Sequence, residues 1–93
     1  MKPREYTRGK ALRVFWVDST QTAGWKYDEE IPVTIERIAT LGWVVTTSPD
    51  GMNMTTTLSR HGGVLSFVSI PWRAITHIQE LNEWDREANL PLT

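Results

Sequence analysis

The alternation of apolar and polar residues predicts a chain built mainly from β-strands. The first strand is expected at Leu12–Asp18, where β-branched and aromatic residues occupy both faces. The cleanest alternation lies at Met52–Ser59. That strand is predicted to bury Met52, Met54, Thr56 and Leu58 and to expose Asn53, Thr55, Thr57 and Ser59.

Two turns divide the chain around this strand into a predicted three-stranded meander. An extended segment begins at Ile31, and Gly42 within it suggests a bulge or a bend. The turn at Ser48–Gly51 ends this segment, because proline presets φ and glycine accepts a left-handed conformation. A second turn at Arg60–Gly63 leads into a strand over Val64–Ile70.

The stretch that follows decides how the sheet is completed. Pro71 has no N–H for a ladder, so we expect a tight turn at Pro71–Ala74 and a short strand at Ile75–Leu81. A C-terminal helix is expected from Asn82, a good N-cap residue that is followed by acidic residues. An alternative remains open, because apolar residues three or four positions apart also fit one amphipathic helix over Pro71–Ala88.

Length and composition predict one small intracellular domain. The 93 residues suit a single domain with a flexible arm at 1–11, a five-stranded barrel at 12–81 and a helix or tail at 82–93. The chain has no cysteine, which excludes disulfides and thiolate metal sites and favours a reducing cytoplasm. No apolar run approaches the ~18 residues of a membrane span. We therefore expect a soluble cytoplasmic protein.

Charge is balanced overall but unevenly distributed. The formal net charge is −1, with basic residues gathered in 1–13 and acidic residues in 80–87. These two ends could contact each other, contact the opposite ends of a neighbour in an oligomer, or stay solvated. A domain-wide basic field is absent, so general nucleic-acid binding is not expected.

The order of strand, long loop, meander, tight turn and short strand resembles that of SH3-like barrels, a group that includes the Sm-like fold. The segment Leu41–Leu58 is similar to the first Sm motif, with its Gly, Asp and Met-Asn at Gly42, Asp50, Met52 and Asn53. Asp50 lies one residue closer to Met52 than that motif has it. The resemblance implies a small SH3-like or Sm-like barrel.

The chain also resembles small uncharacterised proteins of phages and prophages. Those proteins open with a V-x-W-x-D strand and a Gly-Trp, and close with an I-P-x-x-x-I-x-x-I run. The matching residues here are Val14, Trp16, Asp18, Gly24, Trp25, Ile70, Pro71, Ile75 and Ile78. The resemblance covers roughly residues 12–81 and implies a phage or prophage origin, with the host cytoplasm as location.

No residue pattern predicts catalysis or a metal site. His61 and His77 are the only histidines, and neither the spacing of metal-binding histidines nor paired carboxylates are present. A nucleophile elbow and a phosphate-cradling glycine loop are also missing. We therefore predict a protein that is not an enzyme and that takes no metal or cofactor.

Aromatic and cationic residues outside the expected strands indicate a binding protein. Nucleotide bases stack on aromatic rings for ~1–3 kcal/mol per base, and Arg or Lys binds phosphate. The long loop after the first strand and the later turns supply such residues. The candidate ligand-binding residues are Trp25, Lys26, Tyr27, Arg60, His61, Trp72 and Arg73. Trp25 and Trp72 fit equally well as lids over the ends of the barrel.

Three functions fit these residues. The first is an oligomeric, non-enzymatic barrel that holds a nucleotide or short nucleic acid between subunits, and in a phage this would sequester a host defence signal. The second is an adaptor whose exposed tryptophans anchor a host or phage protein. The third is Sm-like RNA binding, which the near-neutral charge disfavours.

Overall fold

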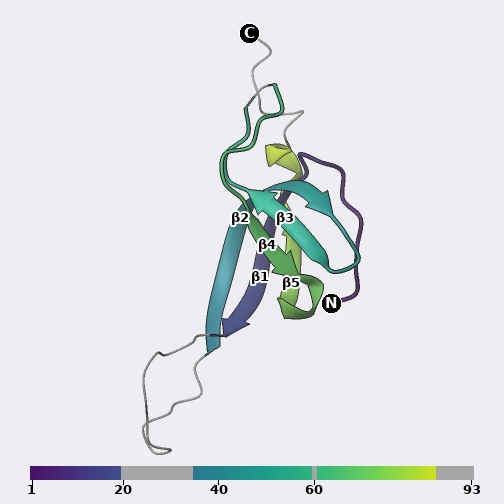
Figure 1. Cartoon of the computed structure of the whole chain (residues 1–93), viewed down its shortest axis with the longest axis vertical. Helices are drawn as coiled ribbons and strands as arrows, with labels where there is room; N and C mark the ends of the chain where they lie inside the picture. The colour runs from purple at the N-terminus through teal and green to yellow at the C-terminus, as the bar shows by residue number, and fades with distance from the viewer. Residues whose placement is uncertain (20–34, 60, 86–93) are drawn as a thin grey trace, which may run out of the picture.

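A computed structural model describes residues 1–19, 35–59 and 61–85, and these form one five-stranded antiparallel sheet (Figure 1). Its strand order is β4-β3-β2-β1-β5. The elements are β1 (Ala11–Ser19), β2 (Ile35–Thr47), β3 (Gly51–Thr55), β4 (Val68–Pro71), the 3₁₀ turn η2 (Trp72–Ala74), β5 (Ile75–Glu80) and the 3₁₀ turn η3 (Asn82–Trp84). The mostly β prediction is confirmed. Strands β4 and β5 form the two edges, so closure into a barrel stays a prediction.

The first predicted strand is confirmed as β1, which lies between β2 and β5. The β1–β2 pairing runs without interruption from Ala11 opposite Trp43 to Ser19 opposite Ile35. Such a run of β-branched and aromatic residues suits a strand paired on both sides. The loop predicted after β1 lies outside the described residues.

Strand β2 belongs to two ladders, because its first part pairs with β1 and its last part pairs with β3. Gly42 sits where β2 passes β3, and a Cβ atom on it would lie 2.3 Å from the carbonyl oxygen of Thr55. Of the bulge or bend expected at Gly42, the bulge lies elsewhere. The β1–β2 register is unbroken there, and the irregularity falls between Val44 and Thr46 in the β2–β3 pairing. Glycine is therefore required by close backbone approach, not by a bulge.

Strand β3 is shorter than the predicted Met52–Ser59, and it departs from the expected alternation at its end. Met52 and Met54 are buried as predicted, but Thr55 is also buried and Thr56 is exposed. The prediction for these two threonines is wrong because the ladder ends at Thr55.

The Thr55 hydroxyl is the reason that the ladder ends there. It donates to the carbonyl oxygen of Ser66, at 2.7 Å, and accepts the backbone N–H of Thr57, at 3.1 Å. Thr55 is 3% exposed, and its buried hydroxyl therefore finds its hydrogen-bond partners in the backbone of the segment that follows β3. Beyond it, a single bridge joins Leu58 and Val64, so the return strand begins only at β4.

The predicted tight turn and closing strand are confirmed as η2 and β5. Strand β5 pairs with β1, with Val14 opposite Ile78, so the alternative of one helix over Pro71–Ala88 is wrong. The apolar spacing that suggested a helix belongs to a strand that is followed by a short turn. The helix expected from Asn82 is not seen in the described residues, where η3 is a single 3₁₀ turn and Asp85 is extended.

The core lies on one face of the sheet. Its members are each at most 4% exposed and comprise Leu12, Val14, Val44, Met52, Met54, Ile70, Trp72 and Ile75. Burying each large apolar side chain contributes about 1.5–3 kcal/mol. Strands β1 and β3 supply two of these residues each, and β2, β4 and β5 supply one each, so all five strands depend on this single cluster.

The segment at residues 1–10, expected as a flexible arm, makes defined contacts with the sheet and its core. The α-amino group of Met1 donates to the carbonyl oxygen of Trp72 at 3.1 Å. Gly9 donates its N–H to the Val44 carbonyl, and Val44 donates to the Lys10 carbonyl, both at 2.8 Å. These bonds attach the segment to the last part of β2, and Met1 and Tyr6 pack against the core.

Substituting Gly42 tests the close approach of β2 and β3. We expect Gly42→Ala to lower the free energy of unfolding by at least about 2 kcal/mol, because the added Cβ meets a backbone carbonyl that cannot move aside. Urea unfolding measures this. The matched control is Thr46→Ala, at an exposed position of the same strand, which should change stability by less than about 0.5 kcal/mol. Equal effects would contradict the assignment.

Candidate binding surface

The predicted ligand-binding residues do not form one site in the described part of the chain. Trp25, Lys26, Tyr27 and Arg60 lie outside the described residues. His61 is exposed in the turn that the Gly62 N–H closes on the Ser59 carbonyl, at 3.0 Å. Arg73 is exposed on η2. The two turns lie at opposite ends of β4, so the structure does not bring His61 and Arg73 together (Figure 1).

Trp72 is a core residue. It is 3% exposed, and its indole Nε1–H donates to the carbonyl oxygen of Ser48 at 2.7 Å. Its backbone N–H also donates to the Asp50 carbonyl at 3.2 Å. The ring therefore joins η2 to the β2–β3 turn, and its burial leaves no face on which a base could stack. Its assignment to a ligand site is corrected accordingly.

A surface that was not predicted lies on the face of β1, β2 and β5 opposite the core, called here the outer face. Phe15 of β1 and His77 of β5 are register partners, with ring centroids 5.8 Å apart and planes inclined at 33°. Phe15 is half-buried and His77 is exposed. The register shifts beside them, between Phe15 and Trp16, and the Thr76 hydroxyl donates to the Phe15 carbonyl at 3.1 Å. The aromatic pair is thus held at a fixed irregularity of the sheet.

The charges of these three strands are segregated between the two faces. Arg13 lies two residues before Phe15 on β1, and Arg37 is the register partner of Val17, which lies two residues after Phe15. Because alternate residues of a strand share a face and register partners share it too, both arginines belong to the outer face. The acidic residues of the same strands occupy the other positions. They are Asp18, Glu36 and Glu80. Within these strands, the outer face therefore carries arginine and no carboxylate.

The aromatic pair and one arginine border the same hollow. This hollow is about 420 Å³ and is open to solvent. Its lining comprises Phe15, Trp16, Val17, Arg37, Ile38, Ala39, Thr76 and His77. An aromatic wall, an apolar floor and a cation in one hollow suit a planar anionic ligand. No hydrogen bond or ion pair occupies the Arg37 guanidinium among the described residues.

Sequence reasoning missed this surface for an identifiable reason. Alternation alone places Phe15 and Val17 on a second face of β1 that needs cover. It cannot say that Arg37 and His77 share that face, because this depends on the β1–β2 and β1–β5 registers. The segregated charge only becomes visible when the three strands are aligned.

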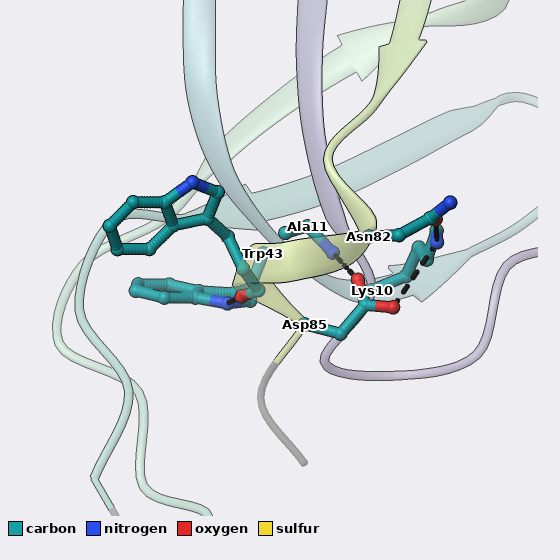
Figure 2. A network of polar contacts seen from close by, with 6 residues as sticks. Lys10, Ala11, Trp43, Asn82 and Asp85 are labelled. Atoms are coloured by element: carbon teal, nitrogen blue, oxygen red, sulfur yellow. Dashed lines mark hydrogen bonds and ion pairs between the residues drawn. The ribbon is translucent and has the colours of Figure 1, made fainter. Parts of the chain in front are cut away.

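A second feature is a polar network that joins the two ends of the described chain (Figure 2). The Asp85 carboxylate accepts the backbone N–H of Ala11 at 2.8 Å and forms an ion pair with Lys10 at 3.2 Å. Lys10 also donates to the side-chain oxygen of Asn82. Of the alternatives for the oppositely charged ends, direct contact is the one that the structure shows.

This network holds η3 near the start of β1, and an apolar groove forms beside it. The Trp43 Nε1–H donates to the carbonyl oxygen of Trp84 at 2.6 Å. The groove is about 250 Å³ and is lined by Ala11, Leu41, Gly42, Trp43, Thr56, Leu81 and Trp84. The Trp84 side chain is 60% exposed, although its backbone is fixed.

No protein-family model, curated protein or solved structure matches this chain. Over residues 1–19, 35–59 and 61–85, no three residues of the metal-binding types gather in one place. The same residues include no helix with the length and apolar content needed to cross a membrane. Function is therefore argued from the geometry of the surfaces.

Replacing Trp72 separates a core role from a ligand role. We expect Trp72→Phe to lower the free energy of unfolding by about 1.5–3 kcal/mol, because it loses core volume and the bond to the Ser48 carbonyl. Thermal or urea unfolding checks this. Arg73→Ala, next in the chain but exposed, should change stability by less than about 0.5 kcal/mol. An unchanged stability of Trp72→Phe would remove Trp72 from the core.

Proposed function

We propose that this protein is a non-enzymatic nucleotide-binding module that holds its ligand on the outer face of β1, β2 and β5. The observation that carries the proposal is the arrangement of Phe15, His77 and Arg37 around one hollow. The exclusion of strand carboxylates from that face supports it. A nucleotide combines a flat aromatic base with negative phosphates, so it matches both properties of the surface.

The outer face supplies each part of such a complex. The base stacks in the hollow beside Phe15 and His77, with about 1–3 kcal/mol expected from stacking. A phosphate meets the guanidinium of Arg37, whose planar fork can donate two parallel hydrogen bonds. Arg13, further along the same face, suits a second phosphate or a second nucleotide unit. The acidic residues on the opposite face do not oppose the ligand.

The strand order and the 3₁₀ turn support the remaining parts of the proposal. A meander β1–β4, with η2 leading to a β5 that returns to β1, follows the order of SH3-like barrels. We accordingly propose an SH3-like or Sm-like barrel. The phage or prophage origin and the action in the host cytoplasm are proposed from the sequence resemblance alone. In that setting a nucleotide-binding protein without catalysis would sequester a host defence signal. Trp25, Lys26, Tyr27 and Arg60 remain predicted contributors, and assembly into a homo-oligomer remains part of the proposal.

Binding to a host or phage protein is the second candidate function. The exposed Trp84 beside an apolar groove favours it, because tryptophan is enriched among residues that dominate protein interfaces. Sm-like RNA binding is less favoured, because Asn53 of the motif already accepts a hydrogen bond from Ser69 at 2.6 Å.

Isothermal titration calorimetry against cyclic di- and trinucleotides, ADP-ribose derivatives and mononucleotides tests the nucleotide proposal. For a nucleotide that binds, we expect Arg37→Ala to weaken the affinity about 10–100-fold through the loss of a charge-assisted hydrogen bond. The affinity should also fall as salt concentration rises.

The matched control is Glu36→Ala, which removes a charge next to Arg37 but on the opposite face. It should leave nucleotide affinity within about threefold, because exposed charges on the far side are screened by solvent. The proposal fails if no nucleotide of the panel gives heat, or if the two variants weaken binding equally.

A further inference from the structure

The outer face places one arginine on each side of the aromatic pair along the direction of β1. Three successive rows of register partners cross this face. They are Leu41–Arg13–Gln79, Ala39–Phe15–His77 and Arg37–Val17. The first row holds one cation, the second holds the aromatic pair, and the third holds the other cation. The hollow lies at the second and third rows, so Arg37 lines it and Arg13 lies one row outside it.

Neither of these guanidinium groups is engaged within the described residues. No hydrogen bond or ion pair there involves Arg13 or Arg37. Their register partners Leu41, Gln79 and Val17 carry no charge. Arg13 is also half-buried, and a charged group that is partly withdrawn from water gains more from an anion than a fully exposed one. Both positions therefore suit a phosphate.

The separation of the two arginines matches the two sides of one nucleoside. Arg13 and Val17 are four residues apart on β1, which is about 13–14 Å, and Arg37 lies opposite Val17 on the neighbouring strand. Arginine side chains are long, so both guanidinium groups can lean toward a ligand at the Phe15 row between them. The hollow of about 420 Å³ is at the small end of ligand pockets and suits one base at this row.

The position of the phosphates distinguishes two classes of nucleotide. In a nucleoside di- or triphosphate, all phosphates follow one another from the 5′ oxygen of the ribose. With the base at Phe15, they extend toward only one of the two arginines. A nucleoside with a phosphate at both its 3′ and its 5′ oxygen instead carries negative charge on each side of its sugar. Every internal unit of an oligonucleotide, linear or cyclic, has this arrangement.

We propose that the outer face selects nucleotides that carry a phosphate on both the 3′ and the 5′ side of one nucleoside. The base stacks at Phe15 and His77, Arg37 binds one phosphate, and Arg13 binds the other. Once the base and the first phosphate are bound, the second phosphate is held close to its arginine and binds as part of the same molecule. This selectivity rests on the proposed nucleotide-binding function and specifies its class of ligand.

Calorimetry with matched nucleotides tests the selectivity. The set comprises the 5′-monophosphate, the 5′-diphosphate and the 3′,5′-bisphosphate of adenosine, guanosine, cytidine and uridine. For at least one base, we expect the bisphosphate to bind about 10-fold or more tightly than either 5′-phosphate form, because it alone engages two arginines. The diphosphate has the same number of phosphates, so it separates the effect of their position from the effect of their number.

Neutral variants of similar length assign the two phosphates. We expect Arg13→Gln and Arg37→Gln each to weaken bisphosphate binding about 10-fold or more, and only one of them to weaken diphosphate binding. The matched control is Arg8→Gln, which removes the same charge where the Arg8 guanidinium donates to the Gly62 carbonyl. It should leave bisphosphate affinity within about threefold, because it lies outside the three rows.

A charge-retaining variant guards against a merely structural effect of Arg13, which is half-buried. Arg13→Lys should keep bisphosphate affinity within about fivefold of the unchanged chain, since lysine also binds phosphate as a point charge. Circular dichroism and the melting temperature verify that each variant is folded. If Arg13→Lys and Arg13→Gln weaken bisphosphate binding equally, the charge of Arg13 is not what binds phosphate and the selectivity is wrong.

Failure of the selectivity and failure of the nucleotide function are distinguishable. If a 5′-monophosphate binds but the bisphosphate binds no more tightly, the nucleotide function stands and the selectivity is wrong. The same holds if Arg13→Gln leaves bisphosphate affinity unchanged. If neither this set nor the cyclic nucleotides give heat, both are wrong.

A 5′-phosphorylated linear dinucleotide and a cyclic dinucleotide then identify the source of the two phosphates. Each contains a nucleoside with a phosphate on both sides. We expect at least one of them to bind as tightly as the bisphosphate, the linear form indicating a chain and the cyclic form a ring. If both bind more weakly than the 5′-monophosphate, the selectivity does not extend to oligonucleotides and the proposal is overturned.

Discussion

The close approach of β2 to the end of β3 is the constraint on which the rest of the structure depends. Gly42 has no side chain, so the Thr55 carbonyl can occupy the space that a Cβ would fill. Strand β2 can therefore leave the ladder with β1 and enter the ladder with β3 without breaking. Because both ladders share one strand, the residues of β1, β3 and β5 reach a common core. Without this approach the sheet would separate into a three-stranded part, β2-β1-β5, and the β3–β4 hairpin.

The same strand also separates the core from the candidate binding surface. Strict alternation along β1 and β2 sends Leu12 and Val14 into the core and Phe15 and Arg37 to the outer face. The segregation of charge follows from this alternation and needs no additional structural feature. Strand β3 ends at Thr55, whose hydroxyl bonds to the backbone of Thr57 and Ser66. The fold and the candidate binding surface therefore depend on the same features of the backbone, above all the alternation along β1 and β2.

Much of the fold could be predicted from sequence because its signals are local. Pro71 stops one strand and Ser48–Gly51 turns another, and both effects depend on neighbouring residues alone. The bulge was misplaced, the predicted strand ending at Ser59 proved too long, and Thr55 was expected to be exposed but is buried, because these features depend on contacts between segments that are distant in sequence. The C-terminal helix was expected from an N-cap signal at Asn82, but Asn82 is the first residue of η3, whose N-cap is Leu81 without a side-chain capping bond.

The candidate surfaces were less predictable than the fold. A tryptophan beside an arginine indicates a binding site in a sequence. Trp72 is instead buried in the core, where its indole N–H donates to the Ser48 carbonyl. The sequence indicated only that Phe15 and Val17 of the outer face need cover, since Phe15, Arg37 and His77 come from three strands. A single sequence does not show the β1–β2 and β1–β5 registers, and these registers decide which distant residues share a face.

The pairing of β1 with β5 has a consequence for how the protein is made. Leu12 near the start of the chain pairs with Glu80 near its end, so β1 has a partner on only one side until β5 has been synthesised. During translation the open edge of β1 is exposed together with its apolar residues, which is the state most prone to pairing with another chain. Contacts between such distant segments also form slowly. Folding on the ribosome is therefore completed only once β5 has left the exit tunnel.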